Sequence, residues 1–449
     1  MGKLFGTDGI RGRANVYPIT PDMALKIGRA TAMTFGAGVN HGLKAVVGKD
    51  TRLSGYMLEK ALVSGLLSMG MDVLEVGPMP TPAVAHLTKS MGAACGFMIT
   101  ASHNPAHDNG IKIFGGDGFK LPDSIENQIE KLIFDGETCP MNIPAEAIGR
   151  AARIDDARGR YIEFAKSSIK NQSLKGLKIV LDCANGAAYS IAPLIFSELG
   201  AEVIVTANRP NGLNINDGCG AMHYEHAAEL VRKHKADVGI SLDGDADRVI
   251  FCDTAGNEVN GDRIIGLCAL DLKNTGRLAE NSVVVTNMSN LGFCAAMKKA
   301  GINVEETQVG DRYVIERMRQ GGFNLGGEQS GHVVFMDYAT TGDGIITALH
   351  VLKIMVANGK KLHELINFMT EFPQVIKSIP VKDKRPIVEI SALRDMIIES
   401  EQALAGNGRA IVRYSGTESK IRVLVEARQQ EQVDFWLNKF LEVIERELQ

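Results

Sequence analysis

The chain has 449 residues, which is too long for a single hydrophobic core and predicts three or four domains. Its apolar fraction of 45%, charged fraction of 23% and net charge of -4 argue against a dedicated nucleic-acid or membrane-surface binder. The opening residues lack the apolar core of a signal peptide, no apolar run is long enough to span a bilayer, and the seven cysteines form no CxxC pair. We therefore expect a cytoplasmic protein with reduced thiols and with no nucleic-acid or membrane partner.

The N-terminal part of the chain alternates short apolar runs with helical segments, an order typical of βαβ units. Predicted strands lie at 45–47, 73–76 and 95–99, and a helical stretch lies near 56–69. The third strand enters the motif TASHNP at 100–105, and another apolar run follows at 111–114.

The same order of elements returns twice further along the chain. The second pass has predicted strands at 178–181, 202–205 and 238–241, and the third has them at 283–285 and 302–304. In the second repeat the motif DGDADR follows at 243–248, and in the third the motif GEQSGH follows at 327–332. Because ligands of open α/β sheets bind at the carboxyl ends of strands, we expect these equivalent loops to carry the function.

The sequence changes character after about residue 370, where short strands and two longer helices indicate a small α+β domain. The predicted fold class is α/β: three similar mixed-sheet α/β domains followed by a smaller α+β C-terminal domain, with the active site in the central cleft. The predicted domains span 1–152, 153–255, 256–370 and 371–449.

DGDADR places three aspartates, Asp243, Asp245 and Asp247, at alternate positions of one loop. Alternate carboxylates can converge on one hard cation, which prefers oxygen ligands. An EF-hand is excluded, because its sixth and twelfth positions would be Arg248 and Thr254 instead of glycine and glutamate. Three protein ligands leave places open for Mg²⁺ to bind a phosphoryl oxygen as well. A solvated acidic turn is the alternative.

TASHNP places Ser102 between a buried-looking strand and a turn that ends at a proline. A lone serine there is often only a turn residue. His103 is adjacent, however, and Lys112 lies on the following strand, so either side chain can transfer protons or stabilise phosphoryl charge.

Three further motifs contain groups that suit a sugar phosphate. In GEQSGH, Glu328 can accept hydrogen bonds from two vicinal hydroxyls while Ser330 orients the ring. The guanidinium of Arg413, with the hydroxyls and glycine of Tyr-Ser-Gly-Thr after it, can hold a phosphate. Arg11, in FGTDGIRG at 5–12, can reach a phosphoryl group. The alternatives are a polar turn for GEQSGH, a plain hairpin turn for the Arg413 motif and a surface ion pair for Arg11.

Taken in order, these loops resemble those of the α-D-phosphohexomutase superfamily over essentially the whole chain. FGTDGIRG and GEQSGH resemble its phosphoglucosamine mutase branch, whereas phosphomannomutase/phosphoglucomutase relatives more often have methionine at the position of Gln329. The resemblance implies that Ser102 is phosphorylated in the active form and that one Mg²⁺ per chain is bound by Ser102, Asp243, Asp245 and Asp247. The residues that it implies around the transferring group are Arg11, His103, Lys112 and Arg248. Those that it implies at the sugar are Glu328, Ser330 and His332, and those at the second phosphate are Arg413, Ser415, Gly416 and Thr417.

The activity implied by the resemblance interconverts glucosamine 6-phosphate and glucosamine 1-phosphate through a phosphoserine enzyme and a 1,6-bisphosphate intermediate. We expect a sugar 1,6-bisphosphate to activate the enzyme and its product to be used in cell-wall (UDP-N-acetylglucosamine) synthesis. We also expect a homodimer, and a last domain that moves to admit and release the ligand. A phosphomannomutase or phosphoglucomutase, a metal-dependent phosphatase and a sugar-phosphate sensor are the alternatives. The sequence does not choose between His103 and Lys112 as general acid–base.

Overall fold

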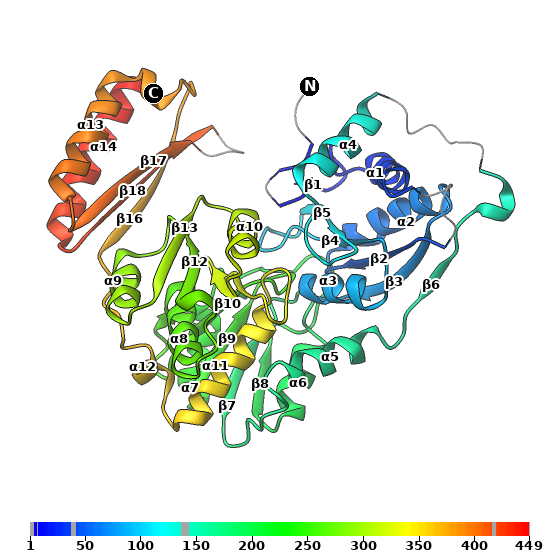
Figure 1. Ribbon diagram of the computed structural model, residues 1–449, viewed down its shortest axis with the longest axis horizontal. Coiled ribbons are helices and arrows are strands. Elements are labelled where there is room, and N and C mark those ends of the chain that lie inside the picture. The colour runs from blue at the N-terminus through cyan, green and yellow to red at the C-terminus, as the bar shows by residue number, and fades with distance from the viewer. Residues whose placement is uncertain (1–3, 7, 37–41, 136–142, 415–418, 449) are drawn as a thin grey trace. The chain divides into compact units, whose positions relative to one another are not determined.

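The computed structural model describes the whole chain except residues 1–3, 7, 37–41, 136–142, 415–418 and 449 (Figure 1). It divides into two compact units. The first comprises Met1–Met288 and Ile302–Asn367, and the second comprises Ser289–Gly301 and Phe368–Gln449.

The first sheet of the first unit has six strands in the order β1-β5-β4-β2-β3-β6. Strands β2, β3, β4 and β6 run parallel, and β5 runs antiparallel to both β4 and β1. Its strands are β1 (Ile10–Arg13), β2 (Lys44–Lys49), β3 (Asp72–Pro78), β4 (Cys95–Ile99), β5 (Asp108–Gly115) and β6 (Ala151–Arg153). Its helices are α1 (Pro21–Thr34), α2 (Leu53–Leu67), α3 (Thr81–Ser90) and α4 (Asp123–Phe134).

The second sheet follows the same plan with strand order β11-β10-β9-β7-β8, in which β10 is antiparallel to β9. Its strands are β7 (Lys178–Asp182), β8 (Glu202–Thr206), β9 (Val238–Leu242), β10 (Val249–Cys252) and β11 (Glu258–Val259). The helices of this part are α5 (Ala157–Ser167), α6 (Ala192–Glu198) and α7 (Glu225–His234).

The third sheet has the order β13-β12-β14-β15, and β15 is antiparallel to β14. Its strands are β12 (Ser282–Thr286), β13 (Asn303–Thr307), β14 (Leu325–Gly327) and β15 (Val333–Phe335). The helices of this part are α8 (Gly261–Asn274), α10 (Asp311–Gly321), α11 (Gly344–Asn358) and α12 (Leu362–Leu365). In all three sheets, the loop that carries a motif therefore joins the last parallel strand to an antiparallel one.

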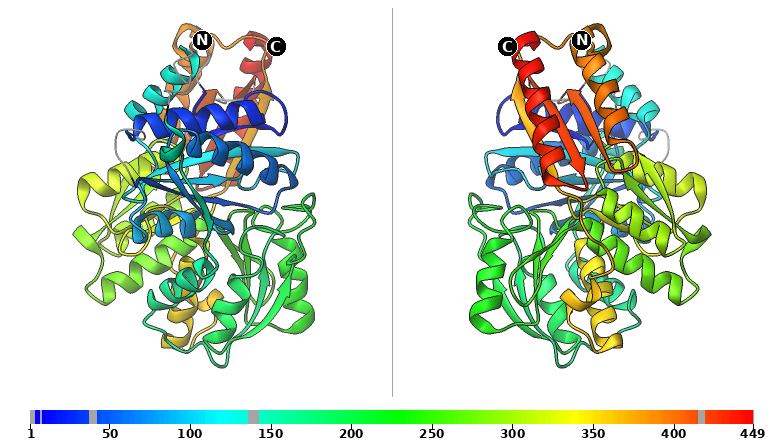
Figure 2. Two further views of the ribbon diagram at one scale, coloured as in Figure 1. Left: turned by 90° about the vertical axis from the view of Figure 1, so that its right-hand side faces the viewer. Right: turned by 90° about the vertical axis from the view of Figure 1, so that its left-hand side faces the viewer.

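The second unit contains a three-stranded antiparallel sheet in the order β16-β18-β17, with α13 and α14 packed against it (Figures 1 and 2). Segment 289–301, with its helix α9, belongs to this unit, and Leu291 N donates a hydrogen bond of 2.6 Å to Glu426 Oε1. The elements are α9 (Leu291–Lys299), β16 (Gln374–Pro380), α13 (Ser391–Leu404), β17 (Gly408–Tyr414), β18 (Lys420–Ala427) and α14 (Gln430–Leu448). The predicted α/β fold class with a smaller α+β C-terminal part is confirmed.

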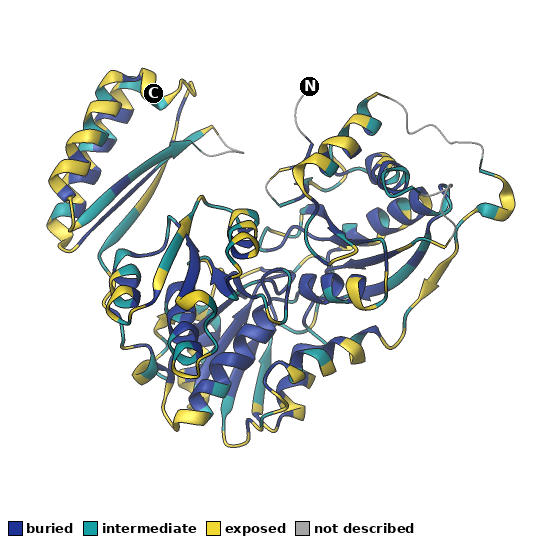
Figure 3. Cartoon of the chain, viewed as in Figure 1, coloured by how far each residue is buried: buried dark blue, intermediate teal, exposed yellow. Residues whose placement is uncertain are grey.

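The cores lie between the central strands and the inner faces of the helices (Figure 3). Every residue of β4, β9 and β12 is buried, because parallel strands covered on both faces consist of nearly continuous apolar runs. Among the described residues, no helix is both long and apolar enough to cross a membrane.

Asp343 caps helix α11 from a buried position. Its Oδ1 accepts hydrogen bonds from Ile345 N (3.0 Å) and Ile346 N (2.9 Å), and its Oδ2 accepts one from Tyr161 Oη (2.7 Å). Burial raises the pKa of the Asp343 carboxyl to about 6, although these donors lower it. The folded state therefore binds this proton more tightly than the unfolded state does, and the resulting stabilisation disappears as the pH rises through 6.

Replacing Asp343 with asparagine keeps an acceptor for the helix but removes the buried charge. We expect the melting temperature of Asp343→Asn, relative to the unmodified protein, to rise as the pH goes from 4.5 to 7.5. A shift of the pKa from about 4 to about 6 corresponds to roughly 3 kcal/mol. Differential scanning calorimetry at several pH values measures the difference, and a difference that does not change with pH would contradict this assignment.

Candidate active site

Ser102 lies at the end of β4 with no side-chain exposure, and its Oγ donates a hydrogen bond of 2.7 Å to Asp243 Oδ2. The two residues follow strands of different sheets, so the structure brings together the TASHNP loop at 100–105 (the serine loop) and the DGDADR loop at 243–248 (the metal loop, named for its predicted ligand). The backbone of Ser102 has φ = 53°, a left-handed conformation that non-glycine residues rarely adopt. Ser102 N donates to Thr100 Oγ1 (2.9 Å), which ties the turn to the strand before it.

The metal loop approaches the serine loop very closely. A Cβ atom at Gly244 would lie 2.5 Å from Ser102 O, so only glycine fits at this position. One carboxylate oxygen from each of Asp243, Asp245 and Asp247 lies within 4.8 Å of the others, and all three residues are buried. Asp245 Oδ1 and Asp247 Oδ1 are buried and have no hydrogen-bond partner among the described residues. These oxygens can bind a divalent cation, so the donor set fits a metal.

The electrostatics of the metal loop also favour a bound cation. Burial, and then the charges of Asp247 and Asp245, raise the pKa of Asp243 well above its usual range. Three carboxylates in a site without solvent repel one another strongly, and a bound cation relieves that repulsion. The acidic loop is thus buried against the serine instead of forming the solvated turn that was its alternative.

Lys112, on β5, reaches the same carboxylates. Its Nζ lies 2.9 Å from Asp245 Oδ2, 2.9 Å from Asp247 Oδ2 and 3.3 Å from Asp8 Oδ2. Burial lowers the pKa of Lys112, but these three carboxylates together raise it well above its usual value. The side chain is therefore an ammonium that brings positive charge to the serine and metal loops.

His103 lies beside Ser102, and two arginines, Arg11 and Arg248, act electrostatically on that histidine. Arg11, on β1, pairs with Asp8, and Arg248 Nε lies 3.8 Å from Asp247 Oδ1. His103 Nδ1 lies 3.4 Å from Ser102 Oγ. Burial, followed by the charges of Arg248 and Arg11, lowers the pKa of His103 to about 4. At neutral pH His103 is a neutral imidazole beside the serine hydroxyl.

The GEQSGH loop at 327–332 (the sugar loop, named for its predicted ligand) joins β14 to β15 and contacts the second sheet, since Val249 N donates to Gly331 O at 3.0 Å. Glu328 Oε1 accepts from Gly310 N (3.2 Å), and Ser330 Oγ lies 3.4 Å from Glu328 Oε2. His332 is buried, and its Nε2 accepts from Gly342 N at 3.2 Å. The loop therefore presents the carboxylate and hydroxyl side by side, while the imidazole supports it from within.

Asp8, Lys120 and Asp311 also belong to this site, although the sequence analysis did not single them out. Lys120 Nζ pairs with both Asp8 and Asp311, and Asp311 Oδ2 lies 3.6 Å from His332 Nε2. The three residues thus connect the Arg11 motif to the sugar loop. Asp8 lies within FGTDGIRG, and that motif was the only sequence signal available for any of them.

Arg413 lies in the second unit, at the end of β17 and opposite Arg422 on β18. Burial, and then the nearby Arg422, lower the pKa of Arg413. A pair of guanidinium groups in register is an arrangement that favours an anion. Ser415, Gly416 and Thr417 lie outside the described residues.

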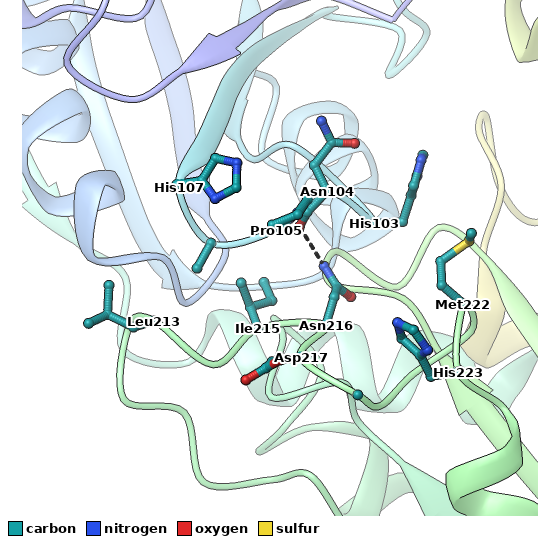
Figure 4. Close-up of a pocket in the computed structure, with 12 residues that line it drawn as sticks. His103, Asn104, Pro105, His107, Leu213, Ile215, Asn216, Asp217, Met222 and His223 are labelled. Atoms are coloured by element: carbon teal, nitrogen blue, oxygen red, sulfur yellow. Dashed lines mark hydrogen bonds between the residues drawn. The ribbon is translucent and has the colours of Figure 1, made fainter. Parts of the chain in front are cut away.

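A pocket with a volume of ≈ 650 Å³ adjoins the serine loop (Figure 4). Residues 103–107 line one side of it, and residues of the segment 213–223 line the other. Asn216 crosses between the two segments, and its Nδ2 donates to Asn104 O at 3.0 Å. The pocket therefore lies where loops of the first two sheets of this unit meet.

Four family models match the chain in order. They describe phosphoglucomutase/phosphomannomutase alpha/beta/alpha domain I at residues 2–139, domain II at 159–256, domain III at 260–372 and the C-terminal domain at 377–443.

Curated relatives match over the whole chain. A phosphoglucosamine mutase from Geotalea daltonii is 53% identical over 449 residues, which is 100% of this chain and 99% of the relative. A phosphoglucosamine mutase from Bdellovibrio bacteriovorus is 51% identical and covers 99% of both chains.

Solved structures share the fold at lower identity. A phosphoglucomutase/phosphomannomutase family protein from Burkholderia thailandensis has a TM-score of 0.82 and 24% identity, covering 99% of this chain and 97% of that one. The N-acetylphosphoglucosamine mutase of Aspergillus fumigatus, solved with GlcNAc-6P and magnesium, has a TM-score of 0.67 and 18% identity, covering 98% and 95%.

Proposed function

The chain belongs to the phosphoglucosamine mutase family of phosphohexomutase isomerases, and from this premise we propose that Ser102 carries the phosphoryl group that is transferred. The observation that carries the proposal is the 2.7 Å contact between Ser102 Oγ and Asp243 Oδ2, inside a buried triad of aspartates. A nucleophile at that position can form a phosphoester whose oxygens meet the metal loop.

We propose that one Mg²⁺ per chain is held by Asp243, Asp245 and Asp247, together with an oxygen on Ser102. Asp245 Oδ1 and Asp247 Oδ1, which accept no hydrogen bond from the described residues, support this choice, as does the magnesium in the fungal N-acetylphosphoglucosamine mutase complex. When bound, the ion neutralises charge on the phosphoryl oxygens during transfer.

The residues of the chain supply the remaining charge and orientation. Lys112, Arg11 and Arg248 neutralise the equatorial oxygens of the transferring group, because in-line phosphoryl transfer depends mainly on positioning and electrostatics. Proton transfer at the reacting oxygens falls to His103 or Lys112, whose nitrogens lie beside Ser102 or the metal loop.

The sugar is held by Glu328 and Ser330 through its hydroxyls, with His332 behind them. The non-reacting phosphate is held by Arg413, Ser415, Gly416 and Thr417. Because the two phosphates exchange places during the reaction, this phosphate site accepts each of them in turn.

The proposed reaction consists of two successive phosphoryl transfers. First, O1 of glucosamine 6-phosphate attacks phosphoserine, the P–O bond to Ser102 breaks, the O1 proton passes to the base and Ser102 Oγ is protonated. The resulting 1,6-bisphosphate reorients while bound. Ser102 Oγ then attacks the phosphorus on O6, its proton leaves, and O6 is protonated as glucosamine 1-phosphate is released. A free sugar 1,6-bisphosphate restores the phosphoserine if it is lost.

The cytoplasmic location, the use in cell-wall precursor synthesis and the homodimer stay predictions.

Phosphorus NMR tests the proposed specificity. Purified protein with Mg²⁺ and a trace of sugar 1,6-bisphosphate is given glucosamine 6-phosphate, glucose 6-phosphate or mannose 6-phosphate in parallel. We expect glucosamine 6-phosphate to be converted fastest to the 1-phosphate, without inorganic phosphate. Faster conversion of glucose or mannose phosphate would contradict the substrate assignment, and release of inorganic phosphate would indicate a phosphatase.

A further inference from the structure

Arg52 is a completely buried arginine beside the serine loop, and its guanidinium donates to four backbone carbonyls between Ser102 and the start of β5 at Asp108. Nη2 donates to Ser102 O (3.0 Å) and Asn104 O (2.8 Å), while Nη1 donates to Asp108 O (3.0 Å) and to Pro105 O. A buried guanidinium has five N–H donors in a rigid fork, and here one fork spans the whole turn.

Asp50 fixes the orientation of Arg52. Its Oδ2 accepts from Arg52 Nε at 2.8 Å, and both side chains are fully buried. The same Oδ2 accepts from Thr100 Oγ1 (2.7 Å), and Thr100 Oγ1 in turn accepts from Ser102 N. The pair Asp50–Arg52 is therefore connected to both the N–H and the C=O of Ser102.

Asn216, in the loop between β8 and α7, provides a second donor. Its Nδ2 donates to Ser102 O (2.9 Å) and to Asn104 O (3.0 Å), the second of which is drawn in Figure 4. Ser102 O thus receives two side-chain donors. A left-handed serine persists only where its surroundings over-determine it, and these donors provide that constraint.

We propose that Arg52, oriented by Asp50 and assisted by Asn216, is a positioning residue that keeps Ser102 Oγ directed at the metal loop. The inference rests on the proposed function, since it assigns the residues that hold its phosphorylated serine. Arg52 has no exposed atom with which to touch substrate. It acts on the rate of phosphoryl transfer rather than on sugar binding, because small displacements of a nucleophile slow transfer steeply.

The test replaces Arg52 by lysine, which keeps the charge but cannot span four carbonyls. We expect kcat to fall about 100-fold, with KM for glucosamine 6-phosphate changed by less than about threefold. Asn216→Ala, which leaves the buried ion pair intact, is expected to lower kcat about tenfold with the same pattern. Arg317→Lys is the matched control, because Arg317 pairs with Glu305 on the surface of the third sheet and its replacement should leave kcat unchanged.

Arg52→Ala adds a readout that a purely structural role would not move. Added guanidinium ion should restore part of its kcat, whereas ammonium ion should not. Circular dichroism and melting curves identify any variant that fails to fold, and Asn216→Ala then carries the test. A folded variant with unchanged kcat, or with a raised KM alone, would overturn the inference.

A separate measurement distinguishes this failure from failure of the proposed function. Phosphoryl transfer from Ser102 is first measured in a single turnover of the unmodified protein. If that transfer is absent, the proposed function fails; if it is present and equally fast in Arg52→Lys and Asn216→Ala, only the positioning role is wrong.

Discussion

Ser102→Ala should lower kcat by at least about 10⁴-fold, because the substitution removes the oxygen that forms the phosphoester. No other hydroxyl occupies its position 2.7 Å from Asp243 in the part of the chain that the structure describes. The variant should still bind glucosamine 6-phosphate, since the sugar and phosphate contacts belong to other loops. Steady-state kinetics and calorimetric titration measure the two properties.

Ser64→Ala is the matched control for this experiment. Ser64 is exposed on α2, and its hydroxyl donates to Lys60 O within the same helix, so activity should not change. If Ser102→Ala retained more than about 1% of the activity, a different group would have to carry the phosphate, and the proposed mechanism would be wrong.

Asp243→Asn should have two opposite effects. We expect kcat to fall about 10³-fold, because the ligand set for Mg²⁺ loses a charge beside the reacting serine. In the presence of a chelator, however, the variant should be more stable than the unmodified protein by roughly 1 kcal/mol. The reason is that burial beside Asp245 and Asp247 makes the charged form of Asp243 unfavourable in the folded protein, and asparagine cannot ionise.

Melting curves with EDTA and with increasing Mg²⁺ measure this second effect together with the metal affinity. Asp253→Asn serves as control, because Asp253 is a buried carboxylate directly after β10 that accepts hydrogen bonds from Ala255 N and Asn257 N of its own turn. Its Mg²⁺ response should match that of the unmodified protein. An Asp243→Asn variant with an unaltered Mg²⁺ response would show that the triad does not hold the metal.

The fold class, which is confirmed, and the positions of the serine and metal loops between strands depend on local signals in the sequence. The roles of the residues in these loops stay predictions. Alternating apolar runs predict the strands, and β4 and β9 are buried throughout as expected for parallel strands. Both motifs then fall in the loop between a parallel and an antiparallel strand. That the loops approach closely enough for Ser102 to contact Asp243 follows from the packing of two sheets, which Gly244 permits.

The contacts that sequence reasoning missed join residues far apart in the chain. Lys120 pairs with Asp8 and Asp311, and nothing in the local sequence distinguishes such a lysine from one on a solvated surface. Arg52 follows a predicted strand, but its role depends on carbonyls of a loop formed about 50 residues later, as its 3.0 Å contact with Ser102 O shows. The inclusion of segment 289–301 in the second unit likewise depends on tertiary contacts such as Leu291 N with Glu426.

The central claim is that Ser102 exchanges its phosphoryl group with the sugar, and a single turnover with ³²P-labelled phosphoenzyme tests it most directly. The labelled protein is mixed with an excess of unlabelled glucosamine 6-phosphate and Mg²⁺, quenched at successive times, and digested to locate the label. We predict that the label leaves the Ser102 peptide, appears first in the 1,6-bisphosphate and then in glucosamine 1-phosphate. Label that stays on the protein, or that appears as inorganic phosphate, would contradict the account.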